Sequence, residues 1–135
     1  MDLMESLAIS AAGMRVQGER LRVISENIAN ADSVSEIPGG DPYRRKTITF
    51  QNTLDRQLHL DLVKVKKVGL DPSEFTKKYD PNNPAADRQG YVRLPNVNAL
   101  VEMNDMREAQ RSYEANLKVI EVARGMLQRT VDLLR

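Results

Sequence analysis

Apolar side chains recur at a seven-residue spacing through the first thirty positions of the chain, and no proline interrupts them. This spacing is typical of an amphipathic helix, so we predict a helix over residues 3–31. Asp2 followed by Glu5 has the spacing of a capping box, which would close the first turn of that helix. The polar residues Ser10 and Gln17 interrupt the alternate positions of the pattern. The predicted packing stripe consists of Leu7, Met14, Leu21, Ile24 and Ile28.

Residues 97–135 carry a second stripe of the same spacing, again without proline. Pro95 ends the preceding segment, and Asn96 or Asn98 can cap the helix that follows. Gly125 inside this helix costs about 1 kcal/mol relative to alanine, which indicates a mild weakness or a close helix contact. The predicted stripe consists of Met106, Tyr113, Leu117, Ile120, Leu127, Val131 and Leu134.

Two seams of matched period at opposite ends of one chain predict an antiparallel helical pair. Polar residues such as Gln17 and Asn116 lie on these seams, and a lone two-helix hairpin would be weak because buried polar groups need partners. Packing among several copies could supply those partners. We therefore predict a mostly α fold with a small β-rich insertion. In it, residues 1–31 and 96–135 form an antiparallel coiled-coil domain, and residues 32–95 form a loop- and β-rich middle segment.

All six prolines of the chain lie between the two predicted helices. Three segments in this middle region, residues 46–50, 62–66 and 91–94, alternate polar and apolar side chains as a half-buried strand does. Residues 54–60 fit either a helical turn or more strand, and residues 79–87 predict a loop with two proline turns. We expect a small twisted β element that is too small to be stable alone.

Composition narrows the chemistry that the chain can perform. The 135 residues include no cysteine and one histidine, His59, so neither a thiolate site nor a histidine cluster can hold a metal ion. The chain has no glycine-rich phosphate loop and no nucleophile elbow. Its acidic residues are scattered along predicted helix faces, where solvated charge is the simplest interpretation. We predict no enzyme activity, no catalytic residues, no cofactor, no metal site and no small-molecule substrate.

Two short basic clusters, Arg44–Lys46 and the lysines within residues 64–67, are the candidates for nucleic-acid binding. The formal net charge is only +1 and aromatic residues make up 4% of the chain, so a broad positive field and stacking platforms are both lacking. We predict no nucleic-acid partner; contact with a neighbouring subunit, or plain solvation, explains these clusters better. Asp2 and Glu5 stand where a secretory signal carries positive charge, which predicts no cleaved signal peptide.

The segment Ala12–Asn30 resembles the N-terminal signature of the flagellar rod and hook axial proteins, with Leu21, Val23–Ile24 and Asn27–Asn30 as its core. That signature is shared across the family. Two further stretches, Gly39–Lys46 and Tyr79–Asn98, are similar to proximal-rod members of the family, as is the tail from Glu102 to Asn116. Together the resemblance covers nearly the whole chain.

This resemblance implies a structural subunit that polymerises through its terminal helices into the proximal rod, the periplasmic drive shaft that transmits torque. It implies export through the flagellar type III apparatus and a location in the basal body. The implied partners are other copies of the chain, rod proteins of the FlgB, FlgF, FlgG and FliE types, and the export apparatus. Besides the two stripes, Asn27, Asn30 and Asn116 are expected to hydrogen-bond between helices or copies and to fix their register.

Two alternatives remain open from the sequence. The first is another axial rod subunit of the FlgB or distal-rod type, because the N-terminal signature is common to the whole family. The second is a non-enzymatic helical adaptor, which would be soluble and stoichiometric with one partner.

Overall fold

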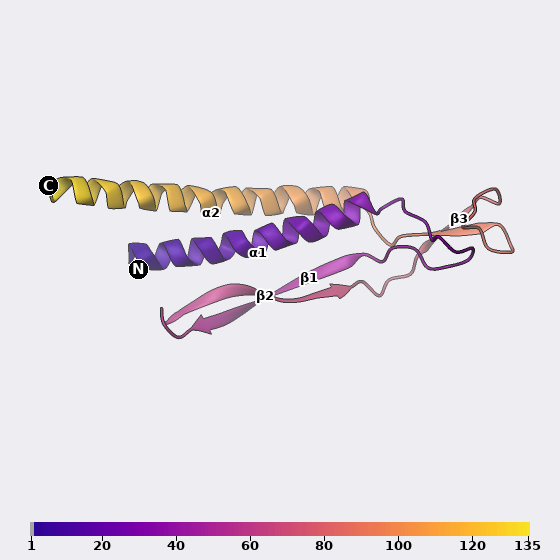
Figure 1. Ribbon diagram of the computed structural model, residues 1–135, viewed down its shortest axis with the longest axis horizontal. Coiled ribbons are helices and arrows are strands. Elements are labelled where there is room, and N and C mark those ends of the chain that lie inside the picture. The colour runs from indigo at the N-terminus through magenta and orange to yellow at the C-terminus, as the bar shows by residue number, and fades with distance from the viewer. Residues whose placement is uncertain (1) are drawn as a thin grey trace. The chain divides into compact units, whose positions relative to one another are not determined.

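The computed structural model describes residues 2–135. Within this range a long helix lies at each end of the chain, and two small antiparallel sheets come between them in the sequence, so the predicted combination of terminal helices with a β-rich middle is confirmed (Figure 1). The elements in chain order are α1 (Leu3–Ala29), β1 (Lys46–Asp55), β2 (Leu60–Leu70), β3 (Thr76–Tyr79), β4 (Tyr91–Leu94) and α2 (Ala99–Leu133).

Both helices begin at the caps that the sequence indicated. The backbone N–H of Asp2 donates to the Glu5 carboxylate over 2.9 Å, as in a capping box. Asn98, not Asn96, caps α2: its side-chain oxygen accepts from the backbone N–H of Leu100 at 3.1 Å and of Val101 at 3.4 Å. The Asn96 side chain instead accepts a hydrogen bond from the backbone N–H of Arg45.

β1 and β2 are longer than the alternating segments predicted, whereas β4 spans the predicted residues 91–94. β1 and β2 pair with each other. Residues 54–60 contain the end of β1, a turn over residues 56–59 and the first residue of β2, so neither a helical turn nor continuous strand describes the whole segment. The Asp55 carboxylate accepts from the backbone N–H of Gln57 and Leu58 in this turn, and His59 adopts a φ of 54°. His59 is exposed and forms part of a turn.

The second sheet includes a strand that the sequence did not predict. β3 pairs antiparallel with β4 in the register Thr76↔Leu94 to Tyr79↔Tyr91. The assignment of Tyr79 to a loop was therefore wrong. The rings of Tyr79 and Tyr91 meet edge to face, with centroids 5.3 Å apart.

The chain divides into two compact units. Unit 1 contains residues 2–21, 49–67 and 107–135, and unit 2 contains residues 22–48 and 68–106. Each unit buries few large side chains. The buried apolar residues are Ala12, Val16, Leu62, Ala109 and Ala123 in unit 1, and Val23, Ile24, Ala85 and Val92 in unit 2. Neither helix of the described chain combines the length and apolar character that a membrane crossing demands.

Candidate functional site

The most buried polar cluster of the protein lies in unit 2 around Glu102. This residue sits in the first turn of α2 and its side chain is fully excluded from solvent. Its carboxylate accepts from the Arg45 Nε in a short charge-assisted hydrogen bond and from the Asn27 amide over 3.2 Å. A buried carboxylate is tolerated because both partners compensate its lost hydration.

Asn27, near the end of α1, makes every hydrogen bond that its side-chain amide can make to fixed groups around it. The amide nitrogen donates to the Lys46 carbonyl over 2.9 Å as well as to Glu102, and the oxygen accepts from the Lys46 N–H at 2.9 Å and the Tyr43 hydroxyl at 2.8 Å. The side chain therefore binds Lys46 as a neighbouring strand would. Aspartate lacks the donors for this role, and alanine lacks both donors and acceptors.

Arg45 extends the cluster to two further segments of unit 2. Its guanidinium pairs with Asp71 over 3.3 Å, and its backbone N–H donates to the Asn96 side chain over 2.8 Å. The Asn96 amide donates in turn to the carbonyls of Asp71 and Ser73, each over 3.1 Å. We call this network the polar lock; its members are Asn27, Tyr43, Arg45, Lys46, Asp71, Asn96 and Glu102.

Charges around the polar lock shift the pKa values of their neighbours in the directions expected for stable ion pairs. Hydrogen bonds from Ser73, with a smaller contribution from Arg45, lower the pKa of Asp71. The hydrogen bond from Lys46 lowers the pKa of Glu26, and the same contact raises the pKa of Lys46. The partners of Arg45 outweigh its burial and raise its already high pKa. These groups are therefore charged at neutral pH.

One sequence-based interpretation was wrong in this region, and another is refined. The side chains of the basic run Arg44–Lys46 bind groups inside unit 2, so solvation alone does not explain them. Glu102 is not a solvated charge on a helix face. A signal was present in the sequence, since Glu102 stands seven residues before Ala109 and fourteen before Asn116, on the face of α2 that turns inward.

In unit 1 the facing parts of α1 and α2 meet through small and polar residues. A Cβ added to Gly13 would lie only 2.8 Å from the Asn116 amide nitrogen, and Arg20 pairs with Glu108 over 3.3 Å. The contacts run in the antiparallel sense, since partners later in α1 lie earlier in α2. The Gln17 side-chain oxygen is buried there without a hydrogen bond. Close approach of the backbones, rather than large apolar side chains, defines this contact.

The residues predicted to pack divide into several groups. Ile24 and Asn27 are buried, whereas Leu7, Met14, Leu21, Ile28, Met106, Tyr113 and Ile120 are half-buried and Leu117, Leu127, Val131 and Leu134 are exposed. Met14, Tyr113 and Ile120 line one groove of about 450 Å³. Asn30 and Asn116 each bond to a carbonyl one turn earlier in their own helix, Glu26 and Ser112 respectively.

A second groove in unit 1, of about 530 Å³, was not anticipated. Apolar side chains line it almost throughout, including Leu3 from α1 and Val119, Val122 and Met126 from α2. Val119, Val122 and Met126 are about half exposed, at 45%, 49% and 51%. Unit 1 thus presents apolar surface on both sides of its helix pair, a property of proteins that bind other proteins.

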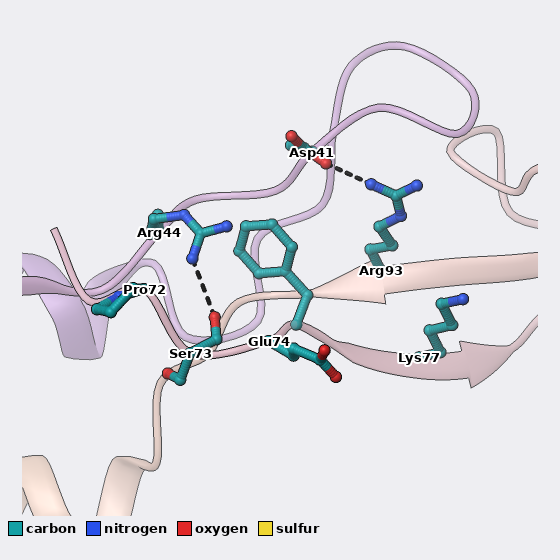
Figure 2. Close-up of a pocket in the computed structure, with 8 residues that line it drawn as sticks. Asp41, Arg44, Pro72, Ser73, Glu74, Lys77 and Arg93 are labelled. Atoms are coloured by element: carbon teal, nitrogen blue, oxygen red, sulfur yellow. Dashed lines mark hydrogen bonds and ion pairs between the residues drawn. The ribbon is translucent and has the colours of Figure 1, made fainter.

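Unit 2 has a polar pocket of about 470 Å³ beside its small sheet, shown in Figure 2. Arg44, Lys77 and Arg93 bring positive charge to it, and the Arg44 guanidinium stacks on the Phe75 ring at 4.2 Å. Among residues 2–135 no group of histidine, cysteine or carboxylate side chains could hold a metal ion.

Comparison with known proteins places these features in context. A family profile described as "Flagellar basal body rod FlgEFG protein C-terminal" matches residues 88–133. The chain is 56% identical over 127 residues to the flagellar basal-body rod protein FlgC of Agrobacterium fabrum, covering 94% of this chain and 91% of that protein. It is 38% identical to FlgC of Escherichia coli O157:H7, with 98% of each chain covered. It is 36% identical to FlgC of Bacillus subtilis, with 98% of this chain and 99% of that protein covered.

Proposed function

Because the chain belongs to the FlgC family of flagellar basal-body rod proteins, we propose that its terminal helices join copies into a rod that transmits torque. The protein is a structural subunit of the flagellar basal-body rod, and the resemblance seen in the sequence is confirmed. We further propose that it occupies the proximal part of the rod, that its helices pack against those of neighbouring copies, and that it contacts other rod proteins.

The apolar surface left open on unit 1 carries this proposal. α2 exposes a series of aliphatic side chains, among them Leu127, Val131 and Leu134 at 38%, 52% and 83%. Such a surface is costly in water and is covered when helices of neighbouring copies pack on it. We infer that residues 1–31 and 96–135 act as the assembly domain, packing as coiled coils between copies, while residues 32–95 form the middle segment.

The partners follow from the same surfaces. Copies of this chain and rod proteins of the FlgB, FlgF, FlgG and FliE types meet the apolar faces of unit 1, and the flagellar type III apparatus exports the chain. The protein acts by assembly, and its mechanism is mechanical: a rod of interlocked helices carries shear without any chemical step.

Electron microscopy of basal bodies from a strain that lacks the gene tests this function. Loss of the rod above an intact membrane ring, restored by the gene, is the expected result. Normal rods in the deletion strain would overturn the proposal and favour a helical adaptor instead.

Substitution of single residues tests the packing. Ile120→Asp and Leu21→Asp place a carboxylate on the half-buried stripes and are expected to abolish rod assembly. Gln110→Asp puts the same group on an exposed position of α2 and serves as the control. Normal swimming with Ile120→Asp would contradict helix packing along this stripe.

A further inference from the structure

The pocket of Figure 2 holds positive charge that unit 2 does not neutralise. Lys77 and Arg93 stand directly opposite each other in the β3–β4 ladder, and like charges at opposed positions repel. Arg93 pairs with Asp41, whereas Lys77 has no hydrogen bond or ion pair within residues 2–135. Asp87 lies near both cations but forms no ion pair with either among the described residues; its Oδ1 accepts from the backbone N–H groups of Gln89 and Tyr91.

The same pocket has a rigid, partly apolar floor. Arg44 donates through Nη1 to the carbonyls of Asp71 and Ser73 over 2.8 and 2.9 Å, which holds its guanidinium over the Phe75 ring. Figure 2 shows the Glu74 carboxylate turned away from Arg44 and Arg93. A pocket with fixed cations beside an aromatic ring suits a peptide segment that carries both a carboxylate and an aliphatic side chain.

Unit 2 itself carries such a segment, residues 32–37, which we call the acidic loop. Asp32 and Glu36 have no ion pair among the described residues, and Ile37 is 70% exposed beside them. Internal bonds hold the loop in place: the Ile37 N–H donates to the Ser35 hydroxyl over 3.1 Å, and the Gly40 N–H donates to the Ile37 carbonyl over 2.9 Å. Exposure of the Ile37 side chain to water is unfavourable. Because the loop is already held by its own hydrogen bonds, a partner that covers this side chain loses little conformational entropy on binding.

We propose that the acidic loop of one copy docks into this pocket of the next copy, with Glu36 on Lys77 and Ile37 against Phe75. No residue of the acidic loop lines the pocket of its own chain. Two different complementary surfaces on one unit make a head-to-tail contact, and contacts of that type build helical polymers. This inference rests on the proposed rod function and adds a contact outside the terminal helices.

Disulfide trapping tests the contact directly, because the chain contains no cysteine. Glu36→Cys combined with Lys77→Cys is expected to give a ladder of covalent multimers of this chain after mild oxidation of purified basal bodies. Glu36→Cys with Lys78→Cys is the matched control, because neighbouring strand residues point to opposite faces. No ladder from the first pair, or equal ladders from both pairs, would overturn the proposal.

A charge exchange gives a second, independent readout. Lys77→Glu and Glu36→Lys alone are each expected to leave roughly tenfold fewer complete rods, because opposed like charges weaken an interface by that much or more. The double variant is expected to recover, which a purely structural role of either residue would not produce. Normal rods in both single variants, or no recovery in the double variant, would contradict the contact. Rods that contain the chain but fail these tests refute only this inference, whereas rods that never contain it refute the proposed function as well.

Discussion

The two compact units of this protein differ in how far the hydrogen bonds of their buried polar groups are satisfied. In unit 2 the polar lock gives Asn27 and Glu102 complete sets of partners, and its charged groups pair within the unit. In unit 1 the Gln17 oxygen is buried without a partner, and the helices leave their larger aliphatic residues at the surface. The buried polar groups of unit 2 are therefore satisfied within one copy, whereas unit 1 is arranged for contacts that a single copy does not contain.

The physical origin of this difference lies in side-chain size. Gly13, Ala109 and Ala123 let the helix backbones of unit 1 approach closely, but such small side chains remove little apolar area from water. Unit 2 gains specificity from directional bonds instead, because each partner of Asn27 accepts only one geometry. A rod subunit with this division has a defined body and an adaptable pair of helical ends.

Removal of the buried carboxylate has the largest effect that we expect on the isolated chain. Glu102→Ala leaves Arg45 without its main partner and the Asn27 amide one bond short. The free energy of unfolding, measured by denaturant titration, is expected to fall by about 3–5 kcal/mol. A loss below about 1 kcal/mol would show that unit 2 is not held by this group.

A double variant separates the cost of an unpaired charge from the value of the pair. Glu102→Met with Arg45→Met replaces the ion pair by apolar side chains of similar length. It is expected to be more stable than Glu102→Ala, since no uncompensated charge remains at the buried position and Asp71 keeps its hydrogen bonds from Ser73. A double variant as unstable as the single one would mean that shape, not charge balance, governs this part of unit 2.

The two asparagines of the N-terminal signature sharpen the comparison within one helix. Asn27→Ala leaves the backbone N–H and carbonyl of Lys46 without hydrogen-bond partners and is expected to lower the free energy of unfolding by about 3 kcal/mol. Asn27→Asp turns a carboxylate oxygen toward Glu102 and is expected to cost about as much. Asn30→Ala removes one bond to the Glu26 carbonyl of the same helix and is expected to cost about 1 kcal/mol. Thermal unfolding monitored by circular dichroism measures both. Equal losses at the two positions would refute a special role for Asn27.

Sequence patterns predicted the elements whose signal is local. The seven-residue spacing located both helices, the Asp2–Glu5 and Asn98 caps located their starts, and alternation located three of the four strands. β3 escaped because all four residues of Thr76–Tyr79 are exposed, so no face of it is apolar. A strand without an apolar face leaves no alternation to read.

The polar lock could be predicted only in part, for a different reason. An asparagine on a helix seam indicated a need for partners, but the partner is a backbone segment nineteen positions away. Glu102 finds Arg45 fifty-seven positions earlier in the chain. Neither pairing follows from local propensity, since both depend on how the middle segment returns to the helices. For this reason the sequence pattern indicated solvated charge at Glu102, where the structure has a buried ion pair with Arg45.

Acid is expected to loosen unit 2 before unit 1. The pKa values of Glu26, Asp71 and Asp87 lie below their ordinary values of 4.5, 3.8 and 3.8, and all three residues belong to unit 2. A carboxylate with a lowered folded pKa stabilises the protein above its unfolded pKa, and that stability is lost as the pH falls through the folded value. Amide hydrogen exchange, corrected for its intrinsic pH dependence, is expected to rise in unit 2 from about pH 4.5 downward. A rise confined to unit 1 would contradict this assignment of the acid-sensitive groups.

Lys46 adds an alkaline limit to the same unit. Its hydrogen bond with Glu26 raises its pKa above the ordinary 10.5. The stability from this pair is complete below the unfolded pKa and is lost as the pH rises through the folded one. Lys46→Gln removes that alkaline loss and leaves the acid response of Asp71 intact, which separates the two effects in one titration.

Three glycines inside the helices of unit 1 give the smallest effects and the finest test of the comparison. A Cβ at Gly18 or Gly125 meets nothing within 4 Å, so alanine is expected to stabilise the free chain by about 0.5–1 kcal/mol at either position. At Gly13 the added Cβ meets the Asn116 amide, and displacing that amide is expected to cancel the gain. If neighbouring copies pack closely on unit 1, Gly18→Ala will melt at a higher temperature than the parent chain yet assemble into fewer rods. Better folding combined with poorer assembly would identify Gly18 as a close contact between copies, whereas full assembly would place that contact elsewhere on the helix pair.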